Sequence, residues 1–144
     1  MSAKNIGPEQ ANQILSSDKN AVYIDVRTEN EFANGHVPNA LNIPVVLPDP
    51  SSRQMTPNPD FLRVVSAHFE KNKKIIVGCQ AGGRSQFAAE ILAREGFLDV
   101  SNMQGGFGGA RDPMGRVIAA GWTQLNLPVE SEIIAANTYA SLKK

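Results

Sequence analysis

Short apolar runs along the chain alternate with segments whose apolar residues recur every three or four positions. The apolar runs lie at residues 21–26, 40–43, 75–77 and 100–103. Their length and their β-branched content predict strands that are buried on both faces of a parallel sheet. Helical spacing of apolar residues predicts helices beginning at Pro8, over residues 60–69 and from Ser85 onward. This alternation predicts an α/β domain with a parallel sheet.

Glycine and proline mark the less regular segments. Residues 45–59 contain four prolines, which predicts a loop without regular structure. The glycine content of residues 108–121 predicts an inserted loop that passes into a short helix from about Pro113. A weak apolar face predicts a C-terminal helix at about residues 130–142. We expect one domain over residues 1–144, with a core from about residue 6 to residue 130.

Composition narrows the possible function classes. Of the 144 residues, 42% are hydrophobic and 19% are charged, as in ordinary soluble domains. Fourteen basic residues balance fourteen acidic ones, so nothing suggests nucleic-acid binding. No apolar run approaches the roughly 20 residues that span a bilayer. The N-terminus shows neither a signal peptide nor a transit segment, and a single cysteine fits a reducing compartment, so we expect a cytoplasmic protein without a metal site.

The only cysteine, Cys79, lies between a predicted strand and a predicted helix. The residues that follow it are Gln80, Ala81, Gly82, Gly83, Arg84 and Ser85. Two adjacent glycines allow a tight turn in which several N–H groups point at one centre, and Ser85 suits the N-cap of the helix. These N–H groups, the helix N-terminus and Arg84 favour an anion. The segment therefore predicts a thiolate at Cys79, the candidate catalytic residue, in a substrate-binding loop formed by residues 80–85.

An inert role for Cys79 is the alternative. A lone cysteine is more often a small buried apolar residue than a nucleophile, and two glycines are found in many plain turns. The order of strand, cysteine, paired glycines, arginine and helix cap within about a dozen residues favours catalysis over this alternative.

Other polar residues receive structural interpretations. Asp25 and Arg27 lie two positions apart at the end of a predicted strand, so they share one direction and can form an ion pair. Thr28 and Glu31 have the spacing of a capping box, and capping is the favoured role of Glu31. His36 has no triad or metal partner in the sequence, so we interpret it as structural. His68 is interpreted as a surface residue of a helix.

Three groups of motifs resemble the rhodanese family of sulfurtransferases. Cys79, Gly82, Arg84 and Ser85 fit its active-site loop. Upstream, Asp25 and Arg27 followed by Glu31, Gly35, His36 and Pro44 fit a second signature of this family. Downstream, Gly105 and Gly106, then Trp122 and the segment 127–129, resemble its closing segment. The resemblance runs from about residue 6 to residue 130.

The resemblance implies a parallel five-stranded sheet with helices on both faces and a persulfide on Cys79. A sulfane sulfur would pass from thiosulfate or a related donor to cyanide, a small thiol or a protein thiol, without a cofactor. Arg84 would orient the loop or the anionic donor, whereas Asp25 and Arg27 would support the cysteine loop from behind. The insertion at residues 108–121 departs from the family pattern, and it is either a border of the active site or a surface loop.

Two rival functions remain open. Cysteine phosphatases place five residues between cysteine and arginine, whereas this chain has four, which suits a sulfur atom better than a phosphate or an arsenate. A phosphatase or arsenate reductase is therefore the weaker reading. A non-catalytic rhodanese-like interaction module is the other rival, but such modules commonly lack the cysteine. The sequence leaves the oligomeric state open.

Overall fold

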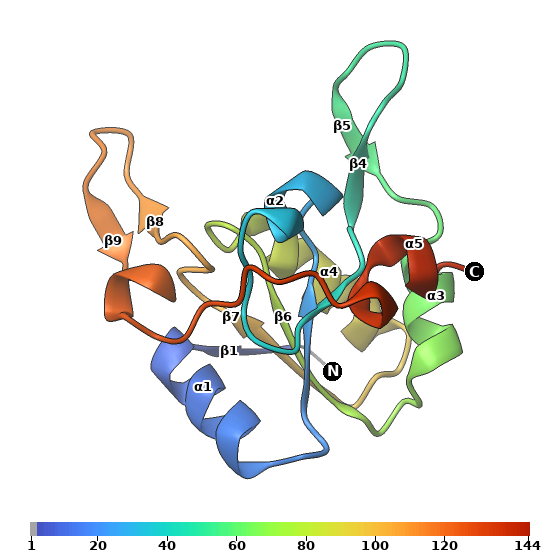
Figure 1. Cartoon of the computed structure of the whole chain (residues 1–144), viewed down its shortest axis with the longest axis horizontal. Coiled ribbons are helices and arrows are strands. Elements are labelled where there is room, and N and C mark those ends of the chain that lie inside the picture. Colours follow the sequence, from blue (N-terminus) through green and yellow to red (C-terminus); the bar gives the residue numbers. More distant parts are fainter. Residues whose placement is uncertain (1–2) are drawn as a thin grey trace.

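A five-stranded parallel sheet forms the centre of the computed structural model, which describes residues 3–144 (Figure 1). The strands lie in the order β1-β7-β6-β2-β3, and each neighbouring pair is parallel. Their bounds are Lys4–Ile6 for β1, Val22–Asp25 for β2, Leu41–Asn42 for β3, Lys74–Gly78 for β6 and Asp99–Met103 for β7. The predicted α/β fold with a parallel five-stranded sheet is confirmed.

Helices cover both faces of this sheet, as predicted. Successive side chains of a strand point to opposite faces, so Ile75 and Val77 lie in one core cluster and Ile76 lies in the other. The first cluster includes side chains of α3 (Phe61–His68), α4 (Gly83–Arg94) and α5 (Tyr139–Leu142). The second includes side chains of α1 (Pro8–Ser17) and α2 (Glu29–Ala33), together with Trp122, whose predicted place in the core is confirmed.

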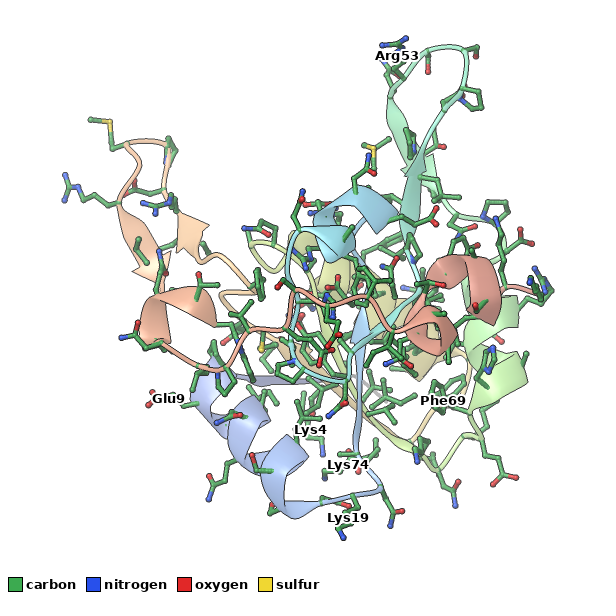
Figure 2. All side chains as sticks on the ribbon, in the orientation of Figure 1. Lys4, Glu9, Lys19, Arg53, Phe69 and Lys74 are labelled. Atoms are coloured by element: carbon green, nitrogen blue, oxygen red, sulfur yellow. The ribbon has the colours of Figure 1, made fainter. Side chains whose placement is uncertain are left out.

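The two ends of the sheet differ in character. At the amino ends of the strands, Asp99 of β7 forms ion pairs with Lys4 of β1 at 3.0 Å and with Lys74 of β6 at 3.4 Å. Figure 2 shows both lysines near each other at this end. Ligands of open parallel sheets bind at the carboxyl ends of the strands, so the site belongs to the opposite end. No helix among residues 3–144 is long and apolar enough to cross a membrane.

The prediction of an irregular loop at residues 45–59 is wrong, because the segment contains an antiparallel hairpin. Its strands are β4 (Val46–Pro48) and β5 (Met55–Pro57), and Arg53 lies at its tip (Figure 2). Both strands are edge strands, so Pro48 and Pro57 are tolerated there despite their missing N–H groups. The turn is held by the Asp49 carboxylate, which accepts hydrogen bonds from the backbone and hydroxyl of Ser51.

The prediction of a short helix from Pro113 is also wrong, because a second hairpin occupies this segment. Strands β8 (Ala110–Arg111) and β9 (Val117–Ala119) pair antiparallel and project from the body of the domain (Figure 1). Asp112 accepts hydrogen bonds from the N–H groups of Met114 and Arg116, so local side-chain bonding favours a turn over a helix.

The C-terminal helix is shorter than predicted. Only a 3₁₀ turn, η2 (Ala135–Asn137), and α5 are helical within residues 130–142. Glu130 instead pairs with His36 through two backbone hydrogen bonds of 2.8 Å, and this pairing keeps the start of the segment extended. Another 3₁₀ turn, η1 (Thr123–Leu125), follows Trp122.

Candidate active site

Cys79 follows β6 directly, at the carboxyl end of the central strand. Its side chain is only 2% exposed, and its Sγ accepts a hydrogen bond from the N–H of Gly82 at 3.0 Å. Gly82 has φ 116°, a left-handed conformation that costs glycine little and strains other residues. The tight turn thus aims a backbone donor at the sulfur.

The predicted N-cap at Ser85 is wrong, because Gly82 caps α4 and Ser85 lies in its first turn. The left-handed Gly82 lets the helix begin at Gly83, closer to the cysteine than the sequence suggests. The first N–H groups of a helix have no partner within it and carry partial positive charge. The earlier start therefore brings the N–H of the N-cap residue, Gly82, within 3.0 Å of the Cys79 sulfur.

Asp25 and Arg27 form a buried ion pair beside the cysteine loop. The guanidinium donates from Nη2 to Oδ2 at 2.8 Å and from Nε to Oδ1 at 3.0 Å. The side chains are 3% and 4% exposed. Burial lowers the pKa of Arg27, but the hydrogen bonds and charge of Asp25 outweigh this and raise it. Arg27 is therefore a fixed positive charge under the site.

Arg27 also connects three loops. Its Nη1 donates to the Gln80 side chain at 3.1 Å, and its Nη2 donates to the carbonyl of Gly35 at 2.7 Å. The guanidinium carbon lies 4.6 Å from the centre of the Phe107 ring, which is a cation–π distance. The structure thus brings Asp25, Arg27 and Gln80 together, and it adds Phe107, which the sequence marked only as part of the resemblance to the closing segment.

Arg84 is held by Glu31 in a bidentate pair. Its Nη1 and Nη2 donate to the two carboxylate oxygens at 2.6 and 2.9 Å. The predicted capping box between Thr28 and Glu31 is confirmed, so Glu31 serves the helix cap and Arg84 at once. The hydrogen bond from Arg84 is the main reason why the pKa of Glu31 falls to about 2. The signal that could have revealed this pair is that α2 and α4 follow the adjacent strands β2 and β6.

The glycine-rich segment at residues 105–109 borders the cysteine loop. The N–H of Phe107 donates to the Cys79 carbonyl at 2.8 Å, and the N–H of Gly108 donates to the Gln80 carbonyl at 2.9 Å. A pocket of about 530 Å³ lies between this segment, the β8–β9 hairpin and α4. Its lining residues are Ala81, Gly82, Gly83, Gln86, Asn102, Gln104, Gly105, Ala110, Ile118 and Ala119. Of the two roles left open for the insertion, the structure therefore shows the border of the site.

Neither histidine contacts the cysteine. His36 is buried, its Nδ1 lies 2.8 Å from the Phe32 carbonyl, and its Nε2 lies 3.2 Å from the Glu130 carboxylate. His68 is exposed at the end of α3, with Nε2 2.7 Å from the carbonyl of Leu142. The structural interpretation of His36 and the surface position of His68 are confirmed.

We expect acid to weaken the Glu31–Arg84 contact. Because folding lowers the pKa of Glu31 from 4.5 to about 2, the ionised carboxylate stabilises the fold above pH 4.5. That contribution is lost as the pH falls from 4.5 toward 2. About a third of each side chain is exposed to screening solvent, so we expect Glu31→Gln to lower the free energy of unfolding by only about 1 kcal/mol at pH 7.

Denaturant melts at several values between pH 3 and pH 7 test this expectation. The deficit of Glu31→Gln relative to wild type should shrink toward pH 3, whereas Glu29→Gln, at an exposed position in the same helical turn, should show little deficit at any pH. An equal deficit of Glu31→Gln at pH 3 and pH 7 would contradict the role assigned to the ionised carboxylate.

The sequence around this site is similar to that of a known protein family. Residues 7–111 match the model of the rhodanese-like domain. The chain belongs to the rhodanese-like domain family. The match covers four of the five strands of the sheet (all but β1), the cysteine loop and the glycine-rich segment, and it ends within the β8–β9 hairpin.

Similar proteins of the rhodanese-like family include two from Arabidopsis thaliana. The chloroplastic thiosulfate sulfurtransferase 16 is 47% identical over 85 residues, which cover 59% of this chain and 69% of that protein. The mitochondrial protein HIGH ARSENIC CONTENT 1 is 46% identical over 85 residues, covering 59% of this chain and 49% of that protein. The crystal structure of Rv0390 from M. tuberculosis is similar with a TM-score of 0.65 at 30% identity, over 92% of this chain and 100% of that one. The chain thus matches only part of the two plant proteins.

Proposed function

We propose that this chain transfers a sulfane sulfur from thiosulfate or a related donor to a thiol or cyanide through a persulfide on Cys79. The observation that carries the proposal is the Cys79 Sγ, held 3.0 Å from the N–H of Gly82 at the N-terminus of α4. Oriented backbone donors in a low-dielectric site stabilise negative charge on a small centre. The name of the similar thiosulfate sulfurtransferase 16 supports this class of reaction.

The reaction proceeds by double displacement. The Cys79 thiolate attacks the outer sulfur of thiosulfate, the S–S bond of thiosulfate breaks, and sulfite leaves with the bonding electrons. The new persulfide carries its negative charge on the terminal sulfur. Cyanide or a thiolate then attacks this sulfur, the persulfide S–S bond breaks, and the Cys79 thiolate returns as the leaving group. No step needs a general base, which agrees with the distance of both histidines from the cysteine loop.

Arg84 plays a less direct part in this proposal than its sequence position suggests. Its guanidinium is already engaged by both oxygens of Glu31, so an anionic donor must share or displace that carboxylate. Arg27 is buried against Asp25 and contacts Gln80 of the cysteine loop, so it supports the loop without binding the donor. The backbone of residues 80–85 then provides most of the stabilisation of the persulfide.

Intact-mass analysis tests the proposal. Wild-type protein incubated with thiosulfate should gain one sulfur atom and lose it to cyanide, whereas Cys79→Ser should gain none. Met114→Ser is the control, because Met114 lies exposed at the β8–β9 turn and should load like wild type. Absence of sulfur uptake from every sulfane donor would overturn the proposal. Hydrolysis of a small aryl phosphate faster than sulfur transfer would favour the phosphatase instead.

A further inference from the structure

Asn102 is a buried amide side chain beside the cysteine loop. It belongs to β7, where it pairs in register with Val77 of β6, two residues before Cys79. The residue is only 2% exposed, and its side-chain oxygen accepts a hydrogen bond from Ser85 in the first turn of α4. The carboxyl ends of adjacent parallel strands thus place Asn102 next to the residues that surround the sulfur.

The Ser85 hydroxyl has three acceptors within reach. The Asn102 Oδ1 lies at 2.5 Å, the Gly82 carbonyl at 3.2 Å and the Cys79 Sγ at 3.4 Å. A hydroxyl has one proton, so it can donate fully to only one of them. The proton is assigned to Asn102, because its oxygen is the nearest of the three acceptors, and this leaves the Ser85 oxygen facing the sulfur without donating to it.

Neighbouring side chains fix the orientation of the Asn102 amide. Its Nδ2 donates to the side-chain oxygens of Asn5 at 3.1 Å and Gln86 at 3.0 Å. Gln86 in turn donates from Nε2 to the Glu90 carboxylate at 3.2 Å, and a carboxylate only accepts. The chain of bonds from Glu90 through Gln86 therefore directs the Asn102 oxygen toward Ser85.

We propose that Asn102 is a positioning residue for sulfur transfer, because it withholds the Ser85 proton from the Cys79 sulfur. The benefit of this role for catalysis rests on the proposed function, whereas the test below does not require sulfur transfer. A hydrogen bond donated to a thiolate stabilises the anion and makes it less nucleophilic. By accepting the proton, Asn102 leaves the ionised Cys79 sulfur bound by the Gly82 N–H and more nucleophilic than it would be if Ser85 also donated to it.

Alkylation of Cys79 across a range of pH tests the inference without any sulfur donor. In Asn102→Leu the Ser85 proton is free, and a charged sulfur accepts it in preference to the neutral Gly82 carbonyl. If this hydrogen bond increases the ionisation constant of the thiol about tenfold, alkylation should be about threefold faster at the acid end of the pH range. On the alkaline plateau it should be about threefold slower, because the stabilised thiolate is less nucleophilic. The two profiles should cross. A merely structural loss would shift the rate in one direction at all pH values.

Two further variants keep the result interpretable. In the Ser85→Ala background, Asn102→Leu should no longer change the alkylation profile, because no hydroxyl remains to redirect. Asn102→Asp, which has nearly the same shape, keeps an acceptor for the Ser85 proton and adds a negative charge that disfavours the Cys79 thiolate, so it should slow alkylation at the acid end, opposite to Asn102→Leu. The inference is overturned if Asn102→Leu keeps the wild-type profile, or if its effect persists without Ser85.

The other ionisable groups near the sulfur stay unchanged in these variants. They are Tyr23, Asp25, Arg27, Glu31 and Arg84. Failure of sulfur uptake in wild type alongside crossing alkylation profiles would overturn the proposed sulfurtransferase activity and leave the role of Asn102 standing.

Discussion

Replacing Arg27 by methionine should lower the free energy of unfolding by about 3–5 kcal/mol, since it leaves the Asp25 carboxylate buried without its positive partner. The same substitution removes the hydrogen bonds to Gln80 and Gly35. We therefore expect sulfur uptake by Cys79 to fall as well, because the cysteine loop loses a side-chain anchor. Denaturant melts and intact-mass loading measure the two effects.

Arg84→Met is the matched control. It breaks a bidentate pair of the same chemistry, but the Arg84 and Glu31 side chains are 27% and 32% exposed, so water can solvate the Glu31 carboxylate that remains. We expect it to cost about 1 kcal/mol or less. In Asp25→Asn/Arg27→Met the uncompensated charge is gone, and part of the lost stability should return. If Arg27→Met cost no more than Arg84→Met, burial of the Asp25–Arg27 pair would not matter to the fold.

The sequence was a reliable guide where one strong local pattern decided the structure. The β-branched run at residues 75–77 became the central strand, and Thr28 with Glu31 became a capping box. The cysteine loop was predicted as a strand-to-helix turn because glycine pairs and helix starts act over a few residues. Its cap was misplaced because Gly82, in a left-handed conformation, began the helix before Ser85.

Contacts between distant segments were beyond the sequence. Nothing local marks Asn102 as a neighbour of Ser85 or Phe107 as a neighbour of Arg27, since these contacts depend on the order of β7, β6 and β2 in the sheet. The two hairpins were missed for another reason: proline and glycine were read as breakers, although edge strands tolerate proline and turns need glycine. The Asp25–Arg27 ion pair, by contrast, could be predicted because its two residues lie only two positions apart in the sequence.

Gly106→Ala should damage both the fold and the cysteine loop. Gly106 has φ 62°, and a Cβ added there would lie 2.6 Å from the carbonyl oxygens of Cys79 and Gln80. Left-handed strain contributes roughly 1–2 kcal/mol and overpacking against backbone another 1–3, so we expect a loss of about 2–5 kcal/mol in the free energy of unfolding. The backbone of the cysteine loop must shift to relieve the contact, and sulfur uptake should fall by about tenfold or more.

Gly115→Ala is the control that introduces left-handed backbone strain without a steric contact. Gly115 has φ 86°, but a Cβ there would meet nothing within 4 Å, so only the left-handed strain of about 1–2 kcal/mol should appear, and loading of Cys79 should be unchanged. The difference between the two variants then reports how closely the glycine-rich segment is fitted to the cysteine loop. Because Phe107 and Gly108 donate to carbonyls of that loop, a displaced Gly106 moves the donors and the sulfur together. Equal stability and equal loading of the two variants would show that the segment lies beside the loop without holding it in place.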